Sequence, residues 1–267
     1  MRFERLLLVP AVLATVACIQ GERVIKLRAD GSGTIVDTVT LGEQAREMMG
    51  AMAGMDQTSP AEKKAKQDAK LKARAALMGP GVTLVSFVPG TKTSPEKLTY
   101  AFKDITKIKI EASADSAEND SQSEAKNPLT FRFEKRGLGG LLTVMGVSPK
   151  PDPKAEVPAA PTKEAAEAAA KLQAQALVMM KTMLKGLKMT TLIEVDGKLL
   201  KTSSPWSEGR AVTVLAIDFD QVAADEAGMK KLSAMSGDPG NVDPADLRDV
   251  KGIKVQPTPE LTIEFGK

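Results

Sequence analysis

The first pattern along the chain is an apolar run from Leu6 to Ile19, preceded by Arg2 and Arg5 and followed by polar residues. A membrane-spanning helix needs about 20 apolar residues, and this run is shorter. A basic start, an apolar stretch and small residues at its end are typical of a secretory signal. We therefore expect residues 1–17 to be a signal peptide.

Alternating apolar and polar positions follow the signal and indicate strands. The first two alternating segments flank the turn Asp30-Gly31-Ser32-Gly33, which predicts a hairpin. A second hairpin is predicted at Asp196-Gly197. The expected strands after the first hairpin cover residues 82–88, 98–102, 105–110, 129–135, 141–147, 189–195, 198–202, 211–219 and 262–265.

A helical period predicts three long helices, at residues 43–55, 61–78 and 163–185. The last of these would be about 34 Å long at 1.5 Å per residue. Consecutive hairpins with helices set apart from them favour an antiparallel sheet. We expect an α+β fold in which an antiparallel sheet built from hairpins is accompanied by long segregated helices.

The chain divides around a proline-rich stretch. Residues 149–161 contain five prolines and are predicted to form an extended spacer. Residues 18–148 would form an α+β half with the N-terminal hairpin and two helices, and residues 162–267 a half with the longest helix and further strands. We expect the two halves to pack together as one domain.

Composition excludes several kinds of chemistry. The chain has no histidine and a single cysteine, Cys18. Ser-His-Asp and Cys-His catalysis, disulfides within the chain, and zinc sites built from histidine and cysteine are therefore excluded. The formal net charge of +3 does not provide the dense basic face that nucleic acids require. We expect no nucleic-acid partner, and no residue set indicates a cofactor.

Cys18 ends the segment Thr15-Val16-Ala17-Cys18, in which small residues precede a cysteine. This segment resembles the lipobox of bacterial lipoproteins. The resemblance implies that Cys18 is lipidated and that cleavage before it removes the signal peptide. The alternative is ordinary cleavage after Ala17, which would leave an unpaired thiol in an oxidising compartment. The expected product is a cell-envelope protein anchored to the membrane through lipid on Cys18, facing the periplasm or the outer surface.

Three residues are candidates for ligand contact. Trp206, the only tryptophan, lies in a polar loop, where an exposed aromatic side chain often marks a contact; alternatively it folds back onto the core. Met179 and Met183 share a face of the predicted helix at 163–185 and could line an adaptable apolar groove, although ordinary helix core explains them more simply. The ligand would be an envelope protein or a lipid.

Carboxylates gather at two places near the C-terminus. Asp238, Asp243 and Asp246 supply oxygen donors such as calcium prefers, but their spacing matches no EF-hand, and Asp243 before Pro244 also fits a helix N-cap. Asp218 and Asp220 share a face at strand spacing. We predict no catalytic residues and no metal site, with a carboxylate- or metal-dependent hydrolase as the alternative function.

The predicted helix at 61–78 is strongly basic. It could attract an anionic membrane surface, but a solvated helix face is the favoured interpretation. Its basic residues are Lys63, Lys64, Lys66, Lys70, Lys72 and Arg74, against the acidic residues Glu62 and Asp68.

The lipobox, the early strand at Asp30-Gly31-Ser32-Gly33-Thr34 and the late strand unit at residues 189–219 together resemble uncharacterised bacterial lipoproteins, including the LppM-domain group. The resemblance implies an envelope-anchored α+β domain without known catalytic residues, so it assigns no site. The expected function is binding or structural contact in the cell envelope.

Overall fold

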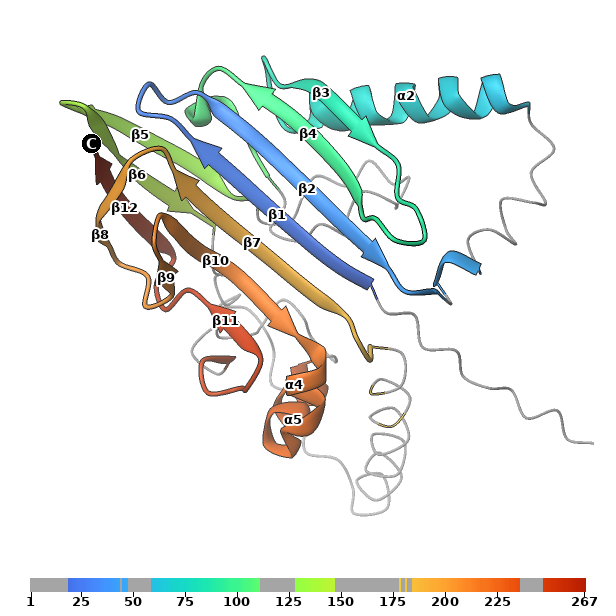
Figure 1. Ribbon diagram of the computed structural model, residues 1–267. Coiled ribbons are helices and arrows are strands. Elements are labelled where there is room, and N and C mark those ends of the chain that lie inside the picture. The colour runs from blue at the N-terminus through green and yellow to red at the C-terminus, as the bar shows by residue number, and fades with distance from the viewer. Residues whose placement is uncertain are drawn as a thin grey trace, which may run out of the picture.

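The computed structural model describes residues 19–43, 45–47, 59–110, 128–146, 178, 181, 184–235 and 247–267. A large sheet forms the body of the molecule, and a small sheet lies against part of one of its faces (Figure 1). Each sheet contains strands from both halves of the chain.

The large sheet has eight strands in the order β11-β10-β7-β1-β2-β4-β3, with β9 paired to β10. At its centre β1 pairs antiparallel with β2 and parallel with β7. The first strands of the two halves therefore lie side by side. The strands are β1 (Ile19–Leu27), β2 (Gly33–Leu41), β3 (Thr83–Val88), β4 (Glu96–Phe102), β7 (Lys188–Val195), β9 (Ser207–Glu208), β10 (Ala211–Asp218) and β11 (Ile253–Val255).

The small sheet is antiparallel, in the order β5-β6-β12-β8. Its strands are β5 (Thr130–Arg136), β6 (Gly139–Met145), β8 (Lys198–Thr202) and β12 (Glu260–Gly266). The hairpin predicted at Asp196-Gly197 is wrong, because β7 and β8 belong to different sheets. Gly197 adopts a φ of 131°, and a side chain there would meet the carbonyl of Gly266, so this glycine lets the chain pass from one sheet to the other.

The helices with described bounds are α2 (Pro60–Leu77), α4 (Phe219–Ala224) and α5 (Glu226–Met235), with a 3₁₀ turn at Ile105–Lys107; residues 43 and 45–47 are helical as well. α2 confirms the helix predicted at 61–78. The strand predicted at 105–110 is wrong, because the side chain of Asp104 accepts a hydrogen bond from the Thr106 amide and starts the 3₁₀ turn. The predicted helices at 43–55 and 163–185 fall mostly outside the described residues.

The predicted fold class, an α+β fold with an antiparallel sheet and long segregated helices, is wrong. The molecule is dominated by its sheets, and the large sheet is mixed because of the β1–β7 pair. A parallel pair needs a long connection between its strands, and no local pattern of apolar residues encodes which distant strand becomes the neighbour.

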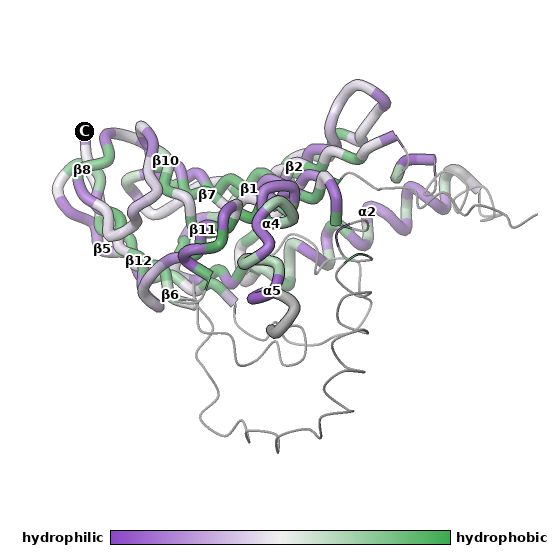
Figure 2. Tube along the Cα trace, turned by 90° about the horizontal axis from the view of Figure 1, so that it is seen from below, coloured by the Kyte–Doolittle hydropathy of each residue, from purple (hydrophilic) through white to green (hydrophobic). Residues whose placement is uncertain are grey.

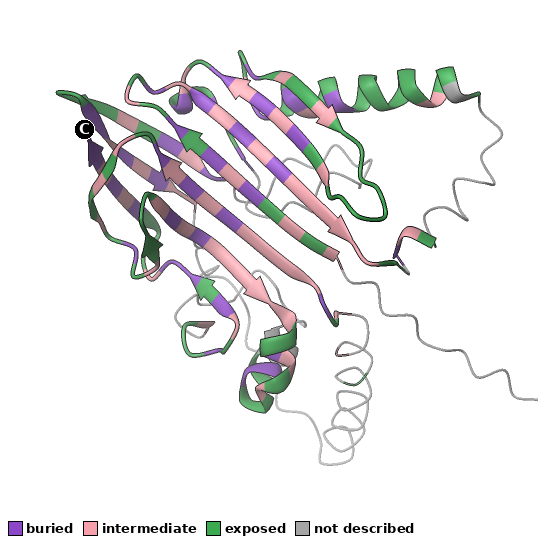
Figure 3. Cartoon of the chain, viewed as in Figure 1, coloured by how far each residue is buried: buried purple, intermediate pink, exposed green. Residues whose placement is uncertain are grey.

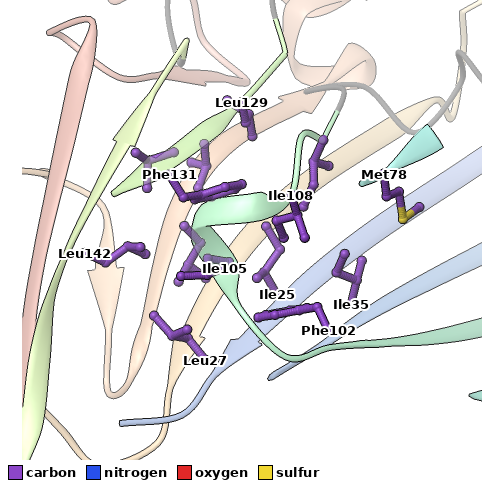
Figure 4. Close-up of a cluster of buried hydrophobic side chains, with 14 of the residues drawn as sticks. Ile25, Leu27, Ile35, Met78, Phe102, Ile105, Ile108, Leu129, Phe131 and Leu142 are labelled. Carbon is purple, nitrogen blue, oxygen red and sulfur yellow. The ribbon is translucent and has the colours of Figure 1, made fainter. Parts of the chain in front are cut away.

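The core lies between the two sheets. Alternate residues of β1, β2, β4 and β7 point to one face, here called the inner face, and pack against β6, β12 and the 3₁₀ turn. Figure 4 shows side chains of β1, β4 and β6 meeting around Ile105. Each fully buried aliphatic side chain of this kind contributes about 1.5 to 3 kcal/mol. Among the residues at the centre of this core are Ile25, Leu27, Ile35, Phe102, Ile105, Ile193, Leu142 and Ile263.

The opposite face of the large sheet, here called the outer face, is not covered by any described helix or strand. Figure 2 shows the small sheet, α2 and α5 on one side of the large sheet. Along the strands buried positions alternate with half-buried or exposed ones (Figure 3). The middle of the outer face is apolar and half-buried, with Leu192, Val24 and Val36 in one row across β7, β1 and β2.

Candidate functional site

Most of the residues that the sequence singled out lie outside the described part of the chain. These are Cys18, Met179, Met183, Asp238, Asp243 and Asp246. One structural fact bears directly on Cys18, because Ile19, the next residue, is the first residue of β1. No linker separates the predicted lipid site from the central strand of the large sheet.

Trp206 is half-buried and lies between β8 and β9. Its amide donates a 3.1 Å hydrogen bond to the Ser204 hydroxyl, and its carbonyl accepts one of 2.9 Å from the Thr213 amide. Gln256, only 1% exposed, donates from Nε2 to the Ser204 hydroxyl at 3.1 Å and to the Thr213 carbonyl. The loop that carries Trp206 is therefore held in a defined position, and its role in contact remains a prediction.

Nothing in the sequence pointed to Gln256. Its amide group lies beside the irregularity between Thr213 and Leu215, where β10 shifts its register against β7. A bulge leaves backbone groups without ladder partners, and the side chain of Gln256 binds two of the carbonyls there. Such a role depends on a contact between distant segments, so no local motif reveals it.

The inner face also carries a buried ion-pair cluster that the sequence analysis missed. Arg23 and Asp37 are 3% and 2% exposed and are joined by two hydrogen bonds, of 2.6 Å from Nε and 2.9 Å from Nη2. Arg74 of α2 adds a 2.9 Å bond to the second carboxylate oxygen. Two strands and a helix therefore meet at one carboxylate.

The hydroxyl of Tyr100 lies in the same region. Tyr100 is fully buried, and its hydroxyl has no hydrogen-bond partner among the residues that the structure describes. Burial raises the pKa of this phenol, and the positive charge of Arg74 acts in the opposite direction. The acidic neighbours Asp37 and Glu96 raise the pKa of Tyr100 further, and Arg23, the second basic neighbour, lowers it.

Asp218 and Asp220 hold local structure at the end of β10. Asp218 forms a 2.9 Å salt bridge with Lys188 and caps α4 by accepting from the amides of Asp220 and Gln221. Asp220 accepts a 2.8 Å hydrogen bond from the Gly186 amide. Burial by itself raises the pKa of Asp218, but hydrogen bonds from Lys188 and Gln221 outweigh it and lower the pKa below the ordinary value.

A pocket of about 250 Å³ lies at the end of β1 farthest from Ile19. Three of its charged lining residues are paired, because Glu194 forms salt bridges with Lys26 at 3.4 Å and with Arg210 at 3.0 Å. The pocket thus lies between solvent-exposed ion pairs on the rim of the sheet. It does not bring together any of the residues that the sequence analysis proposed.

No group of three or more carboxylate or cysteine residues that could hold a metal ion occurs in the described ranges. Within the same ranges, no helix is both long enough and apolar enough to cross a bilayer. No family model, no curated protein and no solved structure matches this chain.

Proposed function

We propose that this protein is a lipid-anchored component of the bacterial cell envelope that acts by binding or structural contact and not by catalysis. The observation that carries the proposal is that β1 begins at Ile19, directly after the lipobox cysteine Cys18. β1 is the central strand of the large sheet. Acyl chains on Cys18 would therefore hold the folded body itself close to the bilayer.

The strength of such an anchor follows from the number of acyl chains. Each buried methylene contributes about 0.8 kcal/mol, so that one chain binds reversibly and two or more hold the protein stably. A lipobox cysteine receives at least two chains in the proteins that this segment resembles. The membrane is thus the first partner of this protein.

The position of Ile19 also gives the sheet an orientation. Ile19 pairs with Leu41 at the end of β2, and its neighbour Gln20 pairs with Lys188 at the start of β7. This end of the sheet, the anchored end, would face the bilayer. The opposite end would lie about 30 Å farther out, since β1 has nine residues at about 3.3 Å each.

Binding is favoured over catalysis by the residues available. The chain has no histidine and no cysteine besides Cys18, so the common nucleophile and base pairs cannot form. The outer face of the sheet, by contrast, offers a half-buried apolar row from Leu192 to Val36, which is the kind of surface that a partner can cover.

Metabolic labelling with an alkyne fatty acid tests the anchor. Wild-type protein should incorporate the probe and fractionate with membranes, and Cys18→Ala should do neither. Ala17→Ser, which keeps a small residue before the cysteine, serves as the matched control and should still be labelled. Equal labelling of the wild type and Cys18→Ala would overturn the proposal.

A further inference from the structure

The edge of the large sheet at β3 has an unused side. β3 pairs with β4 on one side, and no described strand pairs with its other side. Figure 1 shows β3 at the border of the sheet with α2 behind it. An edge strand presents unpaired backbone donors and acceptors, which makes it a template for an added strand.

β3 lacks the charged side chains that usually protect such an edge. Its sequence is Thr-Leu-Val-Ser-Phe-Val, and Val85 and Val88 are 60% and 51% exposed. Leu77, at the end of the adjacent helix α2, is 84% exposed. These are three of the six large apolar side chains that the described part of the chain exposes, so exposed apolar surface is concentrated here.

Two features limit the length of a strand that could pair with the edge of β3. A register shift between Leu84 and Ser86 makes Val85 a bulge, and Pro89 follows the last residue of β3. At the other border of the sheet, β11 has only three residues and includes Lys254. β3 is therefore the longer and less protected of the two edges.

The helix beside this edge is positively charged. α2 contains six basic and two acidic residues, and its first turns extend past the border of the sheet in Figure 1. Lys64, Lys66, Lys70 and Lys72 are exposed. A second copy of the chain paired through β3 would bring two such helices together, and like charges at short range disfavour that arrangement.

We propose that β3 binds an extended, acidic segment of another polypeptide, which adds to the large sheet as a further strand. Apolar side chains of the segment would cover Val85 and Val88, and its carboxylates would be attracted by the lysines of α2. The proposal rests on the binding role proposed above and names the surface and the class of partner. β3 ends at Val88 on the anchored end of the sheet, because Val88 pairs with Lys97 beside Glu96, so the edge extends outward from the bilayer.

The test uses two fluorescein-labelled ten-residue peptides, one alternating valine and glutamate and the other alternating valine and lysine. Binding to the purified full-length protein in detergent is followed by fluorescence anisotropy. The valine–glutamate peptide should bind, more weakly as sodium chloride is raised, and at least tenfold more tightly than the valine–lysine peptide.

Two double variants examine the two parts of the surface. Val85→Glu with Val88→Glu should weaken binding of the acidic peptide at least tenfold, and Lys66→Glu with Lys70→Glu should weaken it severalfold. Leu138→Glu with Leu200→Glu makes the same chemical change at exposed apolar positions elsewhere and should leave binding unchanged. Circular dichroism and the thermal midpoint establish that each variant is folded.

Several results would overturn the proposal. They are no binding of the acidic peptide, equal binding of both peptides, or no effect of the change at Val85 and Val88. Sedimentation that shows a dimer lost in that variant would instead assign the edge to a second copy of the chain. Cys18→Ala should bind the acidic peptide as the wild type does, so a failed lipid anchor and a failed peptide site give different results.

Discussion

The carboxylate of Asp37 compensates two guanidinium groups in the interior of the molecule. Asp37→Ala removes this compensation while Arg23 stays buried at the inner face. Breaking a buried ion pair by removing one partner costs about 3 to 5 kcal/mol. We expect the free energy of unfolding to fall by about that amount, as measured by urea denaturation followed by circular dichroism.

Two comparisons make the Asp37 prediction specific. Glu134→Ala breaks an exposed pair with Arg136 and should cost less than about 1 kcal/mol. Arg74→Ala should cost less than Asp37→Ala, because Arg23 keeps its two bonds to Asp37. An equal loss in Asp37→Ala and Glu134→Ala would contradict the role of burial.

A second prediction concerns Asp218. Asp218→Asn keeps a good N-cap for α4 but loses the ion pair with Lys188, whereas Asp218→Ala loses both and should cost about 1 kcal/mol more. The pKa of Asp218 is lowered and that of Lys188 is raised by their mutual hydrogen bond. The carboxylate therefore stabilises the fold above its ordinary pKa of 3.8, and this contribution is lost as the pH falls through the lower pKa of the folded state.

Thermal midpoints at pH 7 and at successively lower pH measure this effect. The thermal midpoint of the wild type should exceed that of Asp218→Asn at pH 7, and the difference should shrink as the pH falls below 3.8 and vanish below the lower pKa of the folded state. The Lys188 contribution is present below 10.5 and is lost as the pH rises through the higher pKa of the folded state. A difference between the two proteins that persists undiminished in strong acid would show that the charge of Asp218 is not its source.

The alternation of side chains along a strand explains which residues of the buried ion-pair cluster the sequence could reveal. Arg23 lies two positions before Ile25, and Asp37 two positions after Ile35, so both share the face of buried neighbours. Alternation alone could have predicted a buried charge pair. Arg74, in contrast, reaches Asp37 from a helix whose place against the sheet no local pattern contains.

At the level of single elements, α2 depends on its own sequence more than on packing. Residues 61–70 are exposed or half-exposed, and the buried residues Leu71, Ala75 and Met78 lie at the C-terminal end of the helix. A helix with polar residues all round is stabilised mainly by local interactions. The capping box of Ser59 and Glu62 therefore decides whether its first turns form.

Ser59→Ala should destabilise the first turns of α2 by about 1 kcal/mol. Amide hydrogen exchange at residues 63–66 should accelerate about fivefold, with little change in the global free energy of unfolding. Thr91→Ala, which removes a turn hydrogen bond to Ser94, should leave exchange in α2 unchanged. A global loss of stability without faster local exchange would refute the expectation.

Elements with strong local signals were the ones that the sequence predicted correctly. α2 has Ser59-Pro60 at its start, and the first hairpin has Gly31 with a φ of 84° in its turn. The strand predicted at 105–110 rests on Ile108 and Ile110, which alternate with lysines, whereas the 3₁₀ turn at Ile105–Lys107 places the single apolar residue Ile105 in the core. Alternating apolar and polar residues indicate only that one side of a segment is buried. A short turn packed on the core also has one buried side, so the pattern does not distinguish it from a strand.

For the whole molecule, the proposed anchoring through Cys18 predicts that the two ends of the large sheet lie at unequal distances from the bilayer. Thr93 lies in the loop between β3 and β4, at the same end of the sheet as Ile19. Leu138 lies in the turn between β5 and β6, near Gly266 at the far end. A fluorophore on Thr93→Cys should be quenched by lipids with nitroxide-labelled headgroups, and one on Leu138→Cys should not.

Cys18 is the only native cysteine, so acylation would leave the introduced thiol as the single labelling site. The lipid-free Cys18→Ala protein, labelled in the same two positions and mixed with the same vesicles, provides the control and should show no quenching. Equal quenching at Thr93→Cys and Leu138→Cys in the lipidated protein would contradict the orientation.

The arrangement of the sheets was the part that the sequence could not supply. Turn residues such as Asp196-Gly197 indicate that the chain reverses, but not that β8 leaves for a second sheet. Likewise, β1 and β7 each have an ordinary alternating pattern, and only the assembled core determines that Val24 lies opposite Leu192.

If the chain is exported as proposed, the pairing of β1 with β7 sets an order for its folding. A chain that leaves the secretion channel from its N-terminus would release β1 and β2 well before residues 188–195. Until β7 emerges, the central strand would have one side without its native partner, while the proposed lipid on Cys18 would already confine it to the membrane surface. Contacts between distant segments form slowly, so such a chain would need protection by periplasmic chaperones until its last third has been delivered.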